Sequence, residues 1–347
     1  MMSRLVIATF VALSLGSAAI GAEPANDNQA MLAALQALDS RVAETGYRLA
    51  VAGVPFCPDA VARSGFLVHG LVQYQPALRA DAGAYFGLRD APVVLAVMRE
   101  SAAARAGLRV GDAIIRLAGA DVSRTMAANG GKASFEPVRS TETMIENALR
   151  QGPLTLTVER DGQSVELVIP GDRGCASRFQ LDPSNSMNAS SDGTYVKISS
   201  RIAEFTESED ELALLLAHEL SHNILKHRER LEEQGVSHGL FRSLGKNPGR
   251  IRATEEEADR LALYLMARAG YDISVAPAFW DRFERKAGPG ILSDGTHASR
   301  RERVSMAERE IAVIRAQQAK GALPTPDWLG GGDTPPQQSP SQVGFRR

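Results

Sequence analysis

The chain has 347 residues, more than one ordinary domain, and this length predicts two folded units with tails. Apolar residues make up 44% of the sequence and charged residues 23%, which is a globular composition with enough apolar material for cores. The formal net charge of −2 gives no indication of nucleic-acid binding, and none is expected.

The first 22 residues, MMSRLVIATFVALSLGSAAIGA, have the pattern of a secretory signal. One arginine precedes an apolar run, and small residues stand before Glu23. We therefore expect a signal peptide over 1–22, cleaved near Ala22, and a periplasmic protein. The alternative is a bacterial membrane anchor, which would leave the protein membrane-associated, although the run is short for a bilayer. Because no later segment approaches membrane-spanning length, no transmembrane segment is expected in the mature chain.

The next segment, 23–81, begins with apolar residues at helical spacing between residues 28 and 50. This spacing predicts an amphipathic helix that packs on a neighbouring domain, followed by a connecting segment. The residues that carry the pattern are Met31, Leu32, Leu35, Leu38 and Val42.

The chain contains two cysteines, Cys57 and Cys175. In an oxidising compartment such a pair predicts a disulfide, which here would enclose the whole central segment of the chain. The alternative is two buried free thiols.

From about residue 82 the pattern changes to short apolar runs broken by glycine, which predicts a small β-rich domain over 82–173. Residues 154–169 alternate apolar and polar on both sides of Asp161-Gly162, and this alternation predicts a β-hairpin.

Within the β-rich domain, SAAARAGLRVGDAIIRLAGADV is similar to the SPAxxAGLxxGDxIxxxNG stretch of PDZ domains. Tyr85, Phe86, Gly87 and Leu88 resemble the carboxylate-binding loop of that family. The resemblance implies that this domain binds polypeptides, recognised by a C-terminus that adds as a strand. The alternative is a PDZ fold that serves only as a spacer.

An apolar helix pattern follows at 214–227, LLLAHELSHNILKH. Thr206 to Glu209 resembles a capping box, so we expect the helix to begin there and to continue to about Leu231. His218 and His222 are one turn apart on one face, the spacing that two imidazoles need to bind one Zn²⁺, with Glu219 beside them to take a proton from a bound water. The alternative is a helix with two satisfied histidines.

A second helical pattern begins at Thr254, a candidate cap, and is rich in acidic residues. Glu255 and Asp259 are four residues apart and therefore share a face. We expect Glu255 to complete the coordination of one zinc per chain, and Asp259 to accept the free N–H of a ligand histidine. Glu256 and Glu257 are interpreted as complements of the helix dipole, and His227 as a charge near the end of the first helix.

HELSH followed by EEEADRLALYLMARAGYD resembles the gluzincin metallopeptidase family that contains HtpX, BepA and the CAAX prenyl protease. The resemblance spans roughly residues 186–315. It implies a strand pair over 188–205, before the active-site helix, with an edge on which an extended substrate lies. It also assigns a role near the metal or the oxyanion to His297 and a supporting role to Arg303, although Ala298 replaces the proline of the family. The alternative for His297 is a surface histidine.

These patterns together predict an α+β protein, with a PDZ-like domain followed by a mainly helical zinc metallopeptidase domain at 174–320. The Pro-, Gly- and Gln-rich tail at 321–347 is expected to be disordered. The predicted function is that of an exported zinc endopeptidase that hydrolyses misfolded or envelope proteins. The alternative is a PDZ-based binding or chaperone module with a latent or structural zinc site.

Overall fold

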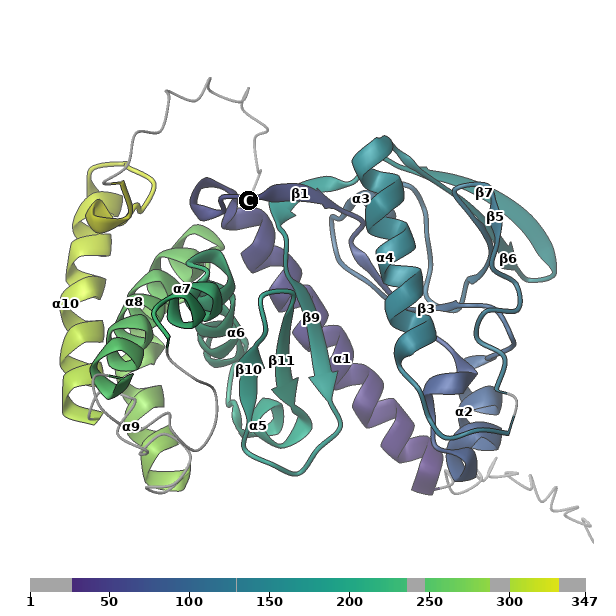
Figure 1. The fold of residues 1–347 in the computed structure, drawn as a ribbon, viewed down its shortest axis with the longest axis horizontal. Helices are drawn as coiled ribbons and strands as arrows, with labels where there is room; N and C mark the ends of the chain where they lie inside the picture. Colours follow the sequence, from purple (N-terminus) through teal and green to yellow (C-terminus); the bar gives the residue numbers. More distant parts are fainter. Residues whose placement is uncertain (1–26, 129, 236–246, 288–299, 331–347) are drawn as a thin grey trace, which may run out of the picture.

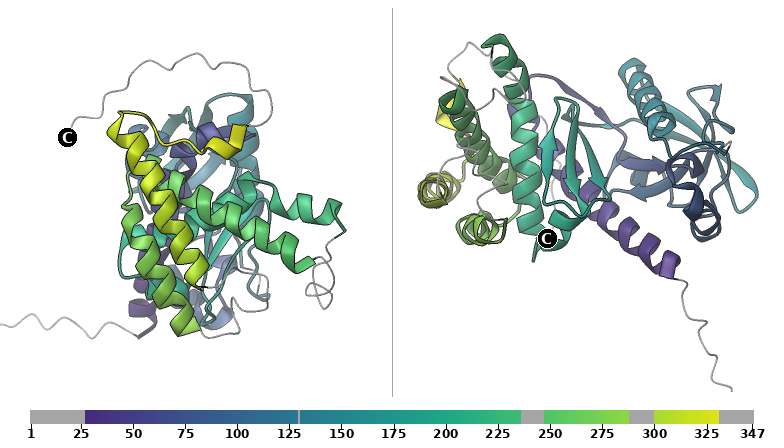
Figure 2. Two further views of the ribbon diagram at one scale, coloured as in Figure 1. Left: turned by 90° about the vertical axis from the view of Figure 1, so that its left-hand side faces the viewer. Right: turned by 60° about the horizontal axis from the view of Figure 1, so that its bottom comes forward.

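The computed structural model describes residues 27–128, 130–235, 247–287 and 300–330. They form a β-rich unit and a mainly helical unit that lie side by side (Figure 1). The long helix α1 (Asp27–Ala52) lies between the two and extends past the helical unit at its N-terminal end (Figure 2). The mixture of helices and small sheets confirms the predicted α+β class.

The β-rich unit is built on a six-stranded sheet in the order β2-β3-β4-β6-β7, with β5 paired to β4. The helix α4 (Glu136–Gln151) packs its buried residues Val138, Ile145 and Leu149 into the same core as the sheet. The sheet begins at Phe66, well before the composition change near residue 82. The remaining elements are β2 (Phe66–His69), η2 (Leu71–Gln73), η3 (Pro76–Leu78), α2 (Arg79–Phe86), β3 (Val93–Val97), α3 (Ala102–Arg105), β4 (Ala113–Leu117), β5 (Ala120–Asp121), β6 (Leu154–Arg160) and β7 (Gln163–Ile169).

The hairpin predicted at 154–169 is confirmed. Strands β6 and β7 pair from Leu154 opposite Ile169 to Arg160 opposite Gln163. Asp161 and Gly162 have φ values of 51° and 74°, so the two-residue turn has the left-handed backbone that suits the twist of the strands.

The chain enters and leaves the β-rich unit through adjacent strands, β1 (Ala60–Arg63) and β8 (Asp172–Cys175), which pair antiparallel. The short helix η1 (Val54–Phe56) leads into β1. The predicted disulfide joins Cys57 to Cys175, 118 residues apart, at the base of this strand pair. The β-rich unit is therefore an insertion between α1 and the rest of the helical unit, and it is covalently closed at its base.

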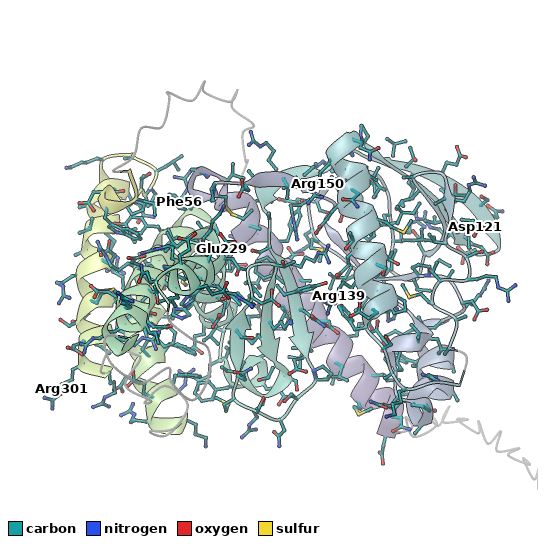
Figure 3. All side chains as sticks on the ribbon, in the orientation of Figure 1. Phe56, Asp121, Arg139, Arg150, Glu229 and Arg301 are labelled. Atoms are coloured by element: carbon teal, nitrogen blue, oxygen red, sulfur yellow. A yellow bond between two sulfur atoms is a disulfide. The ribbon has the colours of Figure 1, made fainter. Side chains whose placement is uncertain are left out.

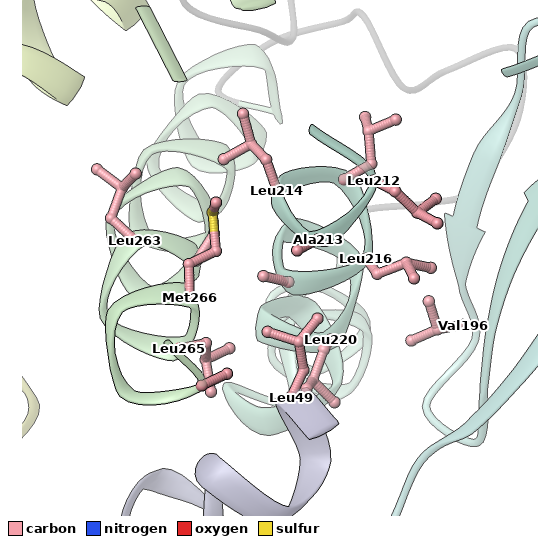
Figure 4. Close-up of a cluster of buried hydrophobic side chains, with 14 of the residues drawn as sticks. Leu49, Val196, Leu212, Ala213, Leu214, Leu216, Leu220, Leu263, Leu265 and Met266 are labelled. Carbon is pink, nitrogen blue, oxygen red and sulfur yellow. The ribbon is translucent and has the colours of Figure 1, made fainter. Parts of the chain in front are cut away.

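The helical unit contains the core shown in Figure 4, where α6 (Glu209–Ile224) and α8 (Asn247–Arg268) lie side by side. Leu49 of α1 packs in the same cluster as Leu216 and Leu220 of α6, which confirms that the first helix packs on a distant part of the chain. A three-stranded sheet in the order β10-β11-β9 lies beside α6. The remaining elements are β9 (Arg178–Asp182), β10 (Ala189–Ser191), β11 (Tyr195–Ser199), α5 (Ser200–Phe205), α7 (His227–Glu233), η4 (Ile273–Val275), α9 (Ala276–Ala287), α10 (Arg300–Ala319) and η5 (Asp327–Gly330).

The two units contact each other through β9 and α4, the helix on which Arg139 and Arg150 are labelled in Figure 3. Arg178 at the start of β9 donates to Glu146 at 2.8 Å, to Glu142 at 3.2 Å and to the hydroxyl of Tyr195 at 2.8 Å. Because the Arg178 side chain is only 10% exposed, this ion cluster is largely shielded from water and fixes how the units meet.

Three predicted helix boundaries are wrong. The cap of α6 is Ser208, whose hydroxyl accepts from the N–H of Glu211, and not Thr206. The helix ends at Ile224 rather than near Leu231, because the chain turns through a left-handed residue, Lys226. Thr254 lies inside α8, where its hydroxyl donates to the carbonyl of Ile251 instead of capping a terminus.

Candidate metal centre

The helix α6 is held in place by burial on almost all sides. Its residues from Leu212 to His218 are all buried, as is Leu220. The acidic first turn, Glu209 to Glu211, complements the positive N-terminal end of the helix dipole. The two histidines are therefore carried by a rigid element, and they lie four residues apart on one face of it.

His218 and His222 of α6 and Glu255 of α8 place one ligand atom each within 4.8 Å of one another. The Nε2 atoms of the histidines are 3.2 Å apart, and the Glu255 carboxylate lies 3.4 Å from His218 and 3.7 Å from His222. Three ligands at 2.0 to 2.1 Å from a tetrahedral Zn²⁺ would lie about 3.3 Å apart. The donor set and its spacing therefore fit zinc.

His218 has a buried acidic partner at its other ring nitrogen. Its Nδ1 lies 2.9 Å from Asp259 Oδ1, and Arg303 donates from Nε to Asp259 Oδ2 at 2.7 Å. Burial alone would lower the pKa of His218, but its hydrogen bonds to the carboxylates of Asp259 and Glu255 outweigh it and raise the pKa. Burial also opposes ionisation of Asp259, yet Arg303 and His218 lower its pKa to about 2. The structure thus brings the predicted supporting residues Asp259 and Arg303 directly behind His218.

Trp280 of α9 contacts both Arg303 and His218. The guanidinium of Arg303 lies 3.6 Å from the centre of the Trp280 ring, and the same ring meets His218 edge-on at 5.9 Å. A cation over an indole face is favourable, particularly where water is excluded, and Arg303 is 3% exposed. The aromatic ring therefore fixes Arg303 and, through it, Asp259.

His222 has a different support, which the sequence interpretation missed. Its Nδ1 lies 2.9 Å from Nδ1 of His227, whose Nε2 lies 3.0 Å from Glu257. His227 is 2% exposed, and burial lowers its pKa to about 4. The hydrogen bond from His227, together with Arg230, lowers the pKa of Glu257 to about 2. The interpretations of His227 as a helix-end charge and of Glu257 as a dipole complement are therefore wrong.

No helical periodicity could have found this group. His227 follows His222 by five residues, which on a continuous helix would place it on another face. Glu257 comes from α8, thirty residues further along the chain. Glu256 is exposed on α8, whose first turn begins nine residues earlier, so it also does not complement the dipole at a helix start.

Glu219 faces a cleft of about 980 Å³ together with His218 and His222. One wall of the cleft is formed by residues 188–193, which contain β10, the outer strand of the three-stranded sheet. The predicted strand pair is present as β10 and β11, while residues 200–205 form the helix α5. Cys57, Pro58 and Asp59 also line the cleft, so the linker to the β-rich unit borders it.

The four residues predicted as a carboxylate-binding loop form the end of a helix. Tyr85 and Phe86 are the last residues of α2, and Gly87 is its left-handed cap with φ 64°. The N–H groups of Gly87 and Leu88 both donate to the carbonyl of Gly83. These donors are therefore already used within the helix end, and the loop prediction is wrong at this point. The predicted signal peptide at 1–22, His297 and residues 331–347 of the tail predicted to be disordered lie outside the described residues. Residues 321–330 of that tail are described, and Trp328 and Leu329 of η5 pack against the core of the helical unit.

Among the described residues, no helix combines the length and the apolarity that a bilayer crossing requires.

Residues 166–249 match the model of peptidase family M48. A curated relative, the "Putative beta-barrel assembly-enhancing protease" of Vibrio cholerae serotype O1, is 30% identical over 118 residues, which cover 26% of this chain and 24% of the relative. The match thus spans about a quarter of that relative's length. A solved structure, an HtrA-type protease AlgW with decapeptide, is 23% identical, covers 33% of this chain and 30% of its own, and has a TM-score of 0.24, too low to carry an argument. Residues 166–249, which contain His218, Glu219 and His222, are therefore similar to a domain of peptidase family M48.

Proposed function

We propose that this chain is an exported zinc endopeptidase that hydrolyses peptide bonds of misfolded or envelope proteins. The observation that carries the proposal is the cluster of His218, His222 and Glu255 at zinc-ligand spacing, with Glu219 beside it in an open cleft. The match to peptidase family M48 supports the metallopeptidase reaction. The name of the Vibrio cholerae relative supports envelope proteins as the substrate class.

A bound Zn²⁺ would supply a Lewis acid that polarises the scissile carbonyl and lowers the pKa of its bound water. His218, His222 and Glu255 would hold the ion. Glu219 follows His218 directly in α6 and would take the proton from the water, then deliver it to the leaving amine. Asp259 keeps the Nδ1 proton of His218 on the side away from the ion, so that Nε2 remains available as a ligand.

The outer edge of β10 suits a polypeptide substrate. Strand β10 pairs with β11 on one side and lines the cleft with residues 188–193 on the other. An extended substrate can pair its main chain with such an edge, which places a peptide bond near the zinc ligands without requiring a particular sequence. This arrangement favours peptides over non-peptide amides as substrates.

The disulfide supports export, because such bonds persist in oxidising compartments. The β-rich unit is proposed to act as a PDZ-like module that recognises substrate or partner polypeptides. Because α2 uses the N–H groups of Gly87 and Leu88 internally, another part of the unit must contact the peptide.

The test of the protease reaction compares the zinc-loaded wild type with Glu219→Gln. A labelled unfolded protein serves as substrate, and the zinc content of every sample is measured. We expect equal zinc in both and a loss of turnover of at least about 100-fold in the variant, because the general base is gone. Glu256→Gln is the matched control, since Glu256 is exposed on α8 and should leave turnover unchanged. A wild type that holds zinc but cleaves nothing would favour a binding module with a latent site.

The recognition role is tested separately by fluorescence anisotropy. Peptides that end in an apolar residue should bind the chain, and amidation of their terminal carboxylate should weaken binding. Equal binding of the free and amidated peptides would contradict C-terminal recognition by the β-rich unit.

A further inference from the structure

His222 is engaged at both of its ring nitrogens. Its Nε2 points to the proposed metal position, 3.2 Å from Nε2 of His218, while its Nδ1 lies 2.9 Å from Nδ1 of His227. The rings of His222 and His227 meet edge-on, with centroids 4.9 Å apart and planes at 80°. The contact therefore joins two specific atoms and is not a stack of two rings.

The protons in this group follow from its chemistry. A histidine that ligates zinc through Nε2 carries its proton on Nδ1, so His222 must donate to His227 Nδ1. That leaves His227 with its proton on Nε2, which donates to Glu257 Oε2 at 3.0 Å. Glu257 in turn accepts from Arg230 at 2.6 Å. Each of these three hydrogen bonds therefore has one donor and one acceptor, and no two protons face each other.

The fold builds this arrangement at a local conformational cost. Lys226 adopts the left-handed region, with φ 52° and ψ 38°, which is unfavourable by about 1 kcal/mol for a residue with a side chain. This turn ends the run of α6 and starts α7 at His227, so that the imidazole folds back onto His222. An uninterrupted α6 would direct residue 227 elsewhere.

The two proposed histidine ligands are thus supported in different ways. His218 contacts Asp259 directly, and Arg303 binds the far side of that carboxylate. His222 reaches Glu257 only through the neutral ring of His227, and Arg230 binds the far side of that carboxylate. Both pathways end in a carboxylate paired with an arginine.

We propose that His227 is a positioning residue, which fixes the tautomer and ring orientation of His222 by accepting its Nδ1 proton, with Glu257 holding His227 in the matching tautomer. The inference rests on the proposed zinc site and extends it to two residues of α7 and α8 that bind no metal themselves. Partners of this kind typically change metal affinity by about 10- to 100-fold.

The experiment measures zinc affinity by competition with a chromophoric chelator at one fixed pH. His227→Leu removes the acceptor while keeping a buried side chain of similar size, and we expect zinc binding about 10- to 100-fold weaker. In His227→Asn the side-chain oxygen keeps a hydrogen-bond acceptor near the position of Nδ1. This variant should therefore keep most of the zinc affinity, although its side chain no longer contacts Glu257. Glu233→Gln, exposed on the same helix, is the control that should match the wild type.

The outcomes separate this inference from the proposed function. A wild type that binds no zinc would refute the metal site and the positioning role together. One zinc per wild-type chain, with His227→Leu binding as tightly, would overturn the positioning role alone. Equal losses of zinc affinity in His227→Leu and His227→Asn would also overturn the positioning role, because a purely structural role does not depend on a hydrogen-bond acceptor at this position. Thermal unfolding of the metal-free variants shows whether both fold.

A measurement on the wild type needs no substitution. Nitrogen-15 NMR of the zinc-loaded chain, labelled at histidine, distinguishes the two neutral tautomers of each ring. We expect His222 protonated at Nδ1 and His227 protonated at Nε2. The reverse assignment for His227 would overturn the proposal, since its Nδ1 would then carry a proton and could not accept one from a zinc-bound His222.

Discussion

His218 and His69 show how the partner of a buried imidazole decides the direction in which its pKa shifts. His218 faces two carboxylates, which raise its pKa in spite of burial. His69 is 1% exposed and its Nδ1 lies 2.9 Å from the hydroxyl of Tyr74, a neutral group, so burial lowers the pKa of His69 to about 3. Phe86 packs edge-on against the same ring at 4.8 Å. Burial beside a neutral partner therefore favours the neutral form of His69 in the folded protein.

His69 should make the protein less stable in mild acid. Above pH 6.5, the ordinary pKa of histidine, His69 is neutral in the folded and in the unfolded chain, so its titration does not reduce the free energy of unfolding. As the pH falls below 6.5, the unfolded chain takes up a proton that the folded chain does not, and stability falls until about pH 3. At about pH 5 the loss is about 2 kcal/mol, from 1.36 kcal/mol per pH unit.

The measurement is denaturant unfolding of the wild type and of His69→Asn near neutral pH and in mild acid. The amide of Asn can keep the hydrogen bond to Tyr74 but does not titrate. We expect the wild type to lose more stability on acidification than the variant. Identical pH dependence in both proteins would show that His69 does not carry the effect.

At the scale of single elements, α1 approaches β9 closely at Gly46. A Cβ atom built on Gly46 would lie 2.2 Å from Cγ of Phe179, whose ring is 6% exposed and packed in the core. In α2, a Cβ atom on Gly83 would find its nearest atom, in Leu71, at 3.7 Å, an ordinary contact. Close packing therefore requires glycine at position 46 of α1 but not at position 83 of α2.

These two helices allow a matched pair of substitutions. Ala is favoured over Gly inside a helix by about 1 kcal/mol, so Gly83→Ala should stabilise the protein slightly. Gly46→Ala should destabilise it by about 1 to 3 kcal/mol, because overpacking of the core outweighs the helix preference. Chemical denaturation of both variants checks the prediction. A stabilised Gly46→Ala would mean that Phe179 can move aside.

For the whole molecule, the disulfide closes a loop that contains the entire β-rich unit. Cys57 and Cys175 lie at the base of the β1 and β8 pair, and both line the cleft that contains Glu219. Gly53 approaches the same place, since a Cβ atom there would lie 2.9 Å from Cys175 Sγ and 2.8 Å from Leu265. The covalent link thus ties the insertion to the core of the helical unit beside the proposed active site.

Removal of the disulfide should lower global stability. For a loop of 118 residues the chain-entropy estimate is about 4 to 5 kcal/mol, and measured losses for native disulfides are about 2 to 5 kcal/mol. We expect a loss of this size for Cys57→Ser with Cys175→Ser, measured by denaturant unfolding under non-reducing conditions. An unchanged unfolding midpoint would contradict this estimate and would mean that the denatured chain keeps structure around this loop, so that the bond removes little of its entropy. The wild type unfolded in reductant is the control, because it lacks the disulfide without carrying the two substitutions.

Several features follow from the sequence because they are encoded over short distances. The spacing of Leu32, Leu38 and Val42 predicts the buried face of α1, and Asp161-Gly162 predicts the turn between β6 and β7. The four-residue spacing of His218 and His222 places them on one helical face whatever the helix packs against. Helical and strand periods are properties of the backbone, so they can be read from residue order alone.

Tertiary structure alone decided how His222 is supported and where the β-rich unit begins. The contact from His222 through His227 to Glu257 depends on the turn at Lys226 and on the packing of α7 against α8, and neither leaves a periodic signal. The insertion of the β-rich unit depends on pairing between β1 and β8, more than 100 residues apart. Such contacts are set by the free energy of packing the whole chain, which no local spacing encodes.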